Sequence, residues 1–74
     1  MTSTHYSMVI QWSDEDHAFL VTLPEFGGGP RTHGDTYEEA VKNGHEVLET
    51  LIEILLEDGV ALPQPSVIKT GQPA

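Results

Sequence analysis

The chain has 74 residues, of which 38% are apolar and none is cysteine, and three basic and twelve acidic side chains give it a formal net charge of −9. A chain of this length forms one domain with a thin core, and the lack of cysteine excludes disulfides and cysteine-ligated metal clusters. Direct binding of nucleic acid is not expected, because phosphate backbones select basic surfaces.

The acidic charge suits a basic protein partner, since opposite electrostatic fields speed encounter and suppress wrong pairings. The alternative is that the charge only keeps the protein in solution. A thin core favours support from a partner or from self-association. Residues 1–8 lack the features of a secretion signal, and no later segment supplies the roughly 20 apolar residues of a membrane span. We therefore expect one soluble, cytoplasmic domain over residues 1–74.

Two alternating segments predict a β-hairpin at the start of the chain. Residues 5–12 and 17–23 alternate between two faces, as half-buried strands do, and a polar turn at residues 13–16 joins them. The inner faces are expected to carry Tyr6, Met8, Ile10 and Trp12, and Phe19, Val21 and Leu23. A brief third strand is expected at residues 31–33, after a glycine-rich loop at residues 24–30.

One long amphipathic helix is predicted over residues 36–58. Asp35 or Thr36 is the expected N-cap, and a following glutamate can reach back to complete a capping box. Gly59 is placed to end the helix, because glycine adopts the left-handed conformation without penalty. The apolar stripe recurs at three- and four-residue steps and consists of Tyr37, Ala40, Val41, Gly44, Leu48, Leu51, Ile52 and Leu55.

The expected fold is α+β, with a three-stranded antiparallel sheet packed on one long helix in the order βββα. The tail at residues 63–74 should be largely irregular, with Val67 and Ile68 as the alternative of a short fourth strand. A helix of about 23 residues is roughly 34 Å long, whereas a compact globule of this size is about 29 Å across. The helix should therefore extend beyond the sheet or be shared with another molecule.

Three groups of residues are candidates for protein contacts. Apolar side chains that widen the helix stripe predict self-association through Val47, Ile54 and Leu56. Acidic side chains on the outer helix face either contact a partner or form only a solvated surface, and they are Glu46, Glu49 and Glu53. The hairpin turn supplies a second set of acidic candidates, Asp14, Glu15 and Asp16.

No combination of residues predicts catalysis. The histidines at positions 5, 17, 33 and 45 lack the short spacings of zinc motifs. The acids at 14–16 are consecutive in one turn, whereas a magnesium site needs carboxylates that converge from rigid elements. The run Gly27–Gly29 lacks the lysine of a phosphate-binding loop and favours a flexible joint. We expect no catalytic residue, no cofactor and no metal.

Four segments resemble the HicB family of antitoxins, in the order and at the spacing of that family. They are YSMVIQWSDED at 6–16, FLVTLPEF at 19–26, THGDTYEEA at 32–40 and LEDGVALPQP at 56–65. The run GDTYEEA after a strand that ends in LPEF is the most specific part. The resemblance covers about residues 5–68.

The resemblance implies a partial ribonuclease H-like fold that lacks the nuclease carboxylates. It also implies binding to a small HicA toxin, an mRNA ribonuclease related to double-stranded-RNA-binding domains, so that the active-site histidine or the RNA surface of the toxin is blocked. Dimers and tetramers are common in the family. HicB proteins usually continue into a DNA-binding domain, whereas this chain ends after its tail, so direct operator binding is not expected. The family loop often reads Pro-Gly-Cys, and contacts through Phe26–Pro30 are expected to differ.

Three functional hypotheses remain open at this point. The first is an inhibitor that docks on a basic ribonuclease, and it predicts a short basic reading frame beside the gene. The second is a stand-alone oligomeric scaffold that has no toxin partner. The third is a residual metal-dependent nuclease on the ribonuclease H-like frame, which would degrade RNA in the presence of magnesium or manganese.

Overall fold

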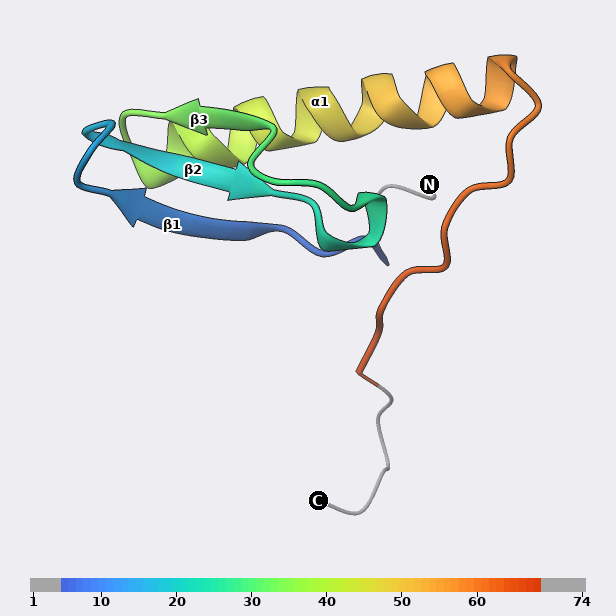
Figure 1. Cartoon of the computed structure of the whole chain (residues 1–74), viewed down its shortest axis with the longest axis horizontal. Helices are drawn as coiled ribbons and strands as arrows, with labels where there is room; N and C mark the ends of the chain where they lie inside the picture. The colour runs from blue at the N-terminus through green and yellow to red at the C-terminus, as the bar shows by residue number, and fades with distance from the viewer. Residues whose placement is uncertain (1–4, 69–74) are drawn as a thin grey trace.

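The computed structural model describes residues 5–68 of the chain. Within them, an antiparallel three-stranded sheet in the order β1-β2-β3 lies against one long helix, α1 (Figure 1). The elements are β1 at Val9–Ser13, β2 at Ala18–Thr22, a 3-10 turn η2 at Pro24–Phe26, β3 at Thr32–Gly34 and α1 at Tyr37–Glu57. The predicted α+β fold with its βββα order is confirmed.

The strands β1 and β2 form the predicted hairpin, but β1 begins later than expected. Pairing starts at Val9, which lies opposite Thr22. The prediction of a strand from residue 5 is wrong, because the same register would set Ser7 opposite Pro24, which has no N–H to donate. The Ser7 amide instead donates to the carboxylate of Glu25 at 3.1 Å.

The turn of the hairpin occupies residues 14–17, one position later than predicted. The Ser13 hydroxyl fixes it, since this group donates to the Asp16 carboxylate at 2.9 Å and accepts from the Asp16 amide at 3.2 Å. His17 closes the turn with a φ of 51°, in the left-handed region that residues other than glycine seldom adopt. The strand β3 is also displaced by one residue from the predicted 31–33.

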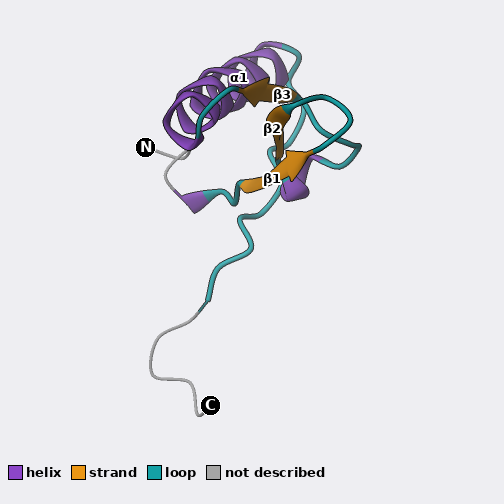
Figure 2. Cartoon of the chain, turned by 90° about the vertical axis from the view of Figure 1, so that its left-hand side faces the viewer, coloured by secondary structure: helices purple, strands orange, loops and turns teal. Residues whose placement is uncertain are grey.

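The helix α1 lies over β3 and β2 and leaves β1 largely uncovered (Figure 2). Its closest approach to the sheet is at its start, where a Cβ added to Gly34 would lie 2.8 Å from the Cα of Ala40. The C-terminal half of α1 extends past the strands, as its predicted length requires (Figure 1). Within residues 5–68, no helix combines the length and the apolar character that crossing a membrane would need.

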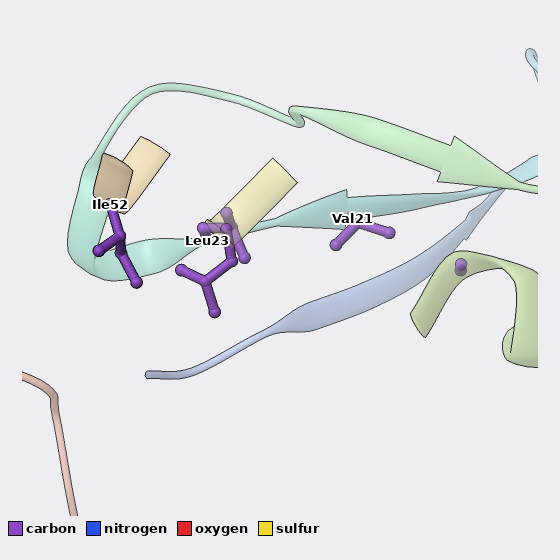
Figure 3. Packing of buried hydrophobic residues seen from close by; sticks show 5 residues of the cluster. Val21, Leu23 and Ile52 are labelled. Atoms are coloured by element: carbon purple, nitrogen blue, oxygen red, sulfur yellow. The ribbon is translucent and has the colours of Figure 1, made fainter. Parts of the chain in front are cut away.

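The core lies between α1 and the inner face of β2 (Figure 3). Its buried side chains are two residues apart at the end of β2 and multiples of four residues apart on the helix, and they are Val21, Leu23, Ala40, Leu48 and Ile52. These are the periods that a strand and a helix impose on one face. Ala18 is buried too, but it lies outside this cluster, on the other face of β2.

Both ends of α1 are capped as the sequence predicted. The Thr36 hydroxyl accepts a hydrogen bond from the Glu39 amide at 3.1 Å, and the Glu39 carboxylate accepts one from the Asp35 amide at 2.6 Å. Gly59 adopts a φ of 70° after the last turn, and the amides that follow the helix donate to its final carbonyls. Because these signals are local, the helix ends within one residue of the predicted bounds.

After α1 the chain continues to Ile68 without regular structure. Leu62 packs against the core, whereas the side chain of Ile68 is 98% exposed. The alternative of a fourth strand at residues 67 and 68 is therefore wrong. The predicted irregular tail is confirmed as far as Ile68, and its remaining residues, 69–74, lie outside the described part of the chain.

We predict that Gly34→Ala lowers the free energy of unfolding by about 3 kcal/mol, because the new Cβ would meet helix backbone that cannot rotate away. Gly29→Ala is the matched control, since open space surrounds that position, and it should change stability by less than about 1 kcal/mol. Urea unfolding followed by circular dichroism measures both. Equal stability of the two variants would contradict the close approach of β3 and α1.

Candidate functional site

The acidic hairpin tip, formed by Asp14, Glu15 and Asp16, is exposed at the end of the sheet where α1 begins (Figure 1). The indole N–H of Trp12 donates to Asp14 Oδ1 at 2.7 Å, and the Ser13 hydroxyl donates to Asp16. An ionised carboxylate has about four acceptor sites, so both groups keep capacity to bind a cation or a donor from another molecule.

The acidic helix face, formed by Glu46, Glu49 and Glu53, is exposed on the side of α1 that points away from the sheet. Steps of three and four residues place these side chains within an arc of about 60° around the helix axis. This face begins in the middle of α1, whereas the hairpin tip lies near the start of the helix (Figure 1). The structure therefore groups each set of three acids but keeps the two sets apart.

The three residues predicted for self-association do not form one patch. Val47 is half-buried and packs against the core. The side chains of Ile54 and Leu56 are 47% and 61% exposed. Ile54 and Leu56 are two positions apart on the helix, so their side chains point in directions about 160° apart around the axis. Only one of these two side chains can face a partner that binds one side of α1.

An aromatic patch lies beside the hairpin tip and consists of Trp12, Phe19 and Tyr37. The Trp12 and Phe19 rings meet edge to face with centroids 5.1 Å apart, and the Phe19 and Tyr37 centroids are 4.2 Å apart. The side chains of Trp12 and Tyr37 are 50% and 63% exposed. The sequence placed both on inner faces but gave no sign that they are open to solvent. The available signal was a tryptophan, a residue enriched in protein interfaces, next to an acidic turn.

The carboxylates and histidines of the described chain do not converge. Among residues 5–68, no three His, Asp or Glu side chains lie close enough together to hold a metal ion. All four histidines are exposed, and they lie on different elements and loops. The chemistry that these dispersed groups offer is the acceptance of hydrogen bonds and the pairing with cations at a surface.

Glu25 fastens both ends of the described chain to the fold, an arrangement we call the Glu25 clasp. Its carboxylate accepts hydrogen bonds from the Ser7 hydroxyl at 2.9 Å and from the backbone amides of Ser7 and Ser66 at 3.1 and 2.8 Å. The Tyr6 hydroxyl donates to the Pro63 carbonyl at 2.6 Å. Burial raises the pKa of Glu25, but the hydrogen bonds from Ser66, its own amide and Ser7 outweigh burial and hold the pKa below its ordinary value of 4.5.

Because the pKa of Glu25 is lower in the folded state, its ionised form stabilises the fold fully above about pH 4.5 and loses this effect as the pH falls through the folded value. We predict that Glu25→Gln lowers the free energy of unfolding by about 1 kcal/mol at neutral pH. The difference from the wild type should shrink on acidification, as measured by unfolding at several pH values. Glu53→Gln is the control on the solvated face, and a deficit of Glu25→Gln that grew at low pH would contradict the clasp.

Comparison with known proteins identifies a family for this chain. The chain matches the model of the family described as HicB_like antitoxin of bacterial toxin-antitoxin system, over residues 6–73. No curated protein and no solved structure matches it. The matched range includes every strand, α1, both acidic groups and the aromatic patch. The chain therefore belongs to the HicB-like antitoxin family of bacterial toxin–antitoxin systems.

Proposed function

We propose that this protein is a non-catalytic antitoxin module that neutralises a HicA-type mRNA ribonuclease by covering its active site or its RNA surface. The observation that carries the proposal is the family match over residues 6–73. The formal charge of −9 supports a basic partner, and a protein that binds RNA phosphates presents such a surface. We also propose a cytoplasmic location, where the mRNA substrate of the toxin occurs, and a partial ribonuclease H-like origin of the fold.

The proposed contacts with the toxin are the hairpin tip and the acidic helix face. Each presents three exposed carboxylates from a regular element or a tight turn, which keeps their charges close together. Exposed charges of this kind act mainly on the rate of association and on partner choice, and less on the strength of the final complex. They support a role in steering a cationic protein to this surface.

We predict that co-expression with the product of a short basic reading frame beside the gene yields a stable complex on size exclusion, and that the complex no longer cleaves RNA.

Neutralising all three carboxylates of the hairpin tip or of the acidic helix face should slow association about tenfold at low salt. The effect should be smaller at about 0.5 M salt, because salt screens electrostatic steering. Stopped-flow mixing compares two triple variants, Glu46→Gln/Glu49→Gln/Glu53→Gln and Asp14→Asn/Glu15→Gln/Asp16→Asn. If no neighbouring basic product forms a complex and RNA cleavage continues, the proposal fails.

A second candidate function is a self-associating scaffold without a toxin partner. The exposed apolar side chains of Ile54 and Leu56 near the end of α1 favour it, since such surface is commonly covered by another molecule. This function predicts a dimer or larger species in light scattering at micromolar concentration, and a monomer for whichever of Ile54→Ser and Leu56→Ser removes the side chain at the contact. A wild-type monomer under these conditions rejects it.

A further inference from the structure

The aromatic patch is an exposed apolar feature that the proposed acidic contacts do not use. Val41 extends it, because this exposed side chain follows Tyr37 by one helical turn. Trp12, Phe19 and Tyr37 come from three different elements, so the patch exists only in the folded protein. Adjoining large apolar side chains at a surface usually mark a contact with another protein.

The fold holds this patch open. Because α1 lies over β3 and β2, it supplies Tyr37 to one side of Phe19 but does not reach across β1 to cover Trp12 (Figure 2). The hydrogen bond from the indole N–H to Asp14 and the edge-to-face contact with Phe19 fix the Trp12 ring from two sides. A side chain that is ordered before binding loses little conformational entropy in a complex.

We propose that the aromatic patch is the main docking surface for the partner, which binds it through an apolar segment that carries arginine. A guanidinium group stacks on aromatic rings and pairs with carboxylates, and the bonded Trp12 and Asp14 present both features side by side. The inference rests on the proposed function for the identity of the partner. It makes the hairpin tip, and not the acidic helix face, the acidic group at the centre of the interface.

Charge distinguishes among the molecules that could occupy the patch. A second copy of the chain would bring another net charge of −9 and a second acidic tip to the same surface, and like charges oppose such contacts. An RNA would set phosphates against the carboxylates of Asp14, Glu15 and Asp16. A cationic segment with apolar neighbours complements both the rings and the acidic tip.

The only tryptophan of the chain is Trp12, so its fluorescence reports on the patch directly. The probes are blocked hexapeptides in which leucine alternates with arginine, lysine or glutamate. We expect a saturable change in emission with the arginine peptide, a weaker one with lysine and none with glutamate. Tyr37→Ala should weaken arginine-peptide binding about fivefold or more, whereas Val60→Ala, at another exposed apolar position, should leave it unchanged.

Circular dichroism checks that Tyr37→Ala is folded, and Val41→Ser tests the same patch if it is not. The inference is overturned by a lack of saturable response to the arginine peptide, by an equal response to the glutamate peptide, or by equal effects of the patch and control substitutions. A shift of the wavelength of maximum emission when the protein alone is concentrated would also overturn the inference, since a second copy would then occupy the patch.

Toxin binding separates this inference from the proposed function. If Trp12→Ala binds the neighbouring basic protein as tightly as the wild type, the patch is rejected while the antitoxin function stands. If the arginine peptide binds the patch but no toxin complex forms, the antitoxin function is rejected while the chemistry of the patch stands. A loss of toxin affinity in Trp12→Ala, without loss in Val60→Ala, supports both.

Discussion

The close contact between Gly34 and the backbone of Ala40 determines how the rest of the molecule is arranged. It places the start of α1 directly over the edge strand β3, so that the helix lies to one side of the sheet (Figure 2). The thin core then runs from the inner face of β2 to the segment that follows it, where Val21 and Leu23 cluster with Leu48 and Ile52 of α1. No large side chain is needed at the closest point, because glycine and alanine let the two backbones approach.

The lateral position of α1 also decides which side chains remain at the surface. On the uncovered side, Trp12 is packed against only one aromatic neighbour of the sheet and is half exposed. The acidic helix face lies on the side of α1 that points away from the sheet, so it is exposed wherever α1 lies across the strands. The family match implies a toxin partner in general, and our proposals place that partner on these surfaces.

The sequence predicted the elements whose signals are local and missed the features that depend on distant residues. The helix bounds followed from Thr36 and Gly59, which act within one turn of the residues they cap. The start of β1 was misplaced because Pro24, seventeen positions after Ser7 in the sequence, decides where pairing stops. The exposure of Trp12 depends on where α1 lies across the sheet, and no periodicity within one segment contains that information.

The Glu25 clasp is the clearest case of such a distant interaction, since Glu25 and Ser66 are separated by 41 positions. Two of its donors are backbone amides, which every residue except proline possesses. Many different amino acids could therefore occupy position 66 without releasing the tail, whereas position 25 needs a carboxylate of the right length. A relative that keeps the fold could vary widely in its two end segments and still hold them, provided that this one acid is retained.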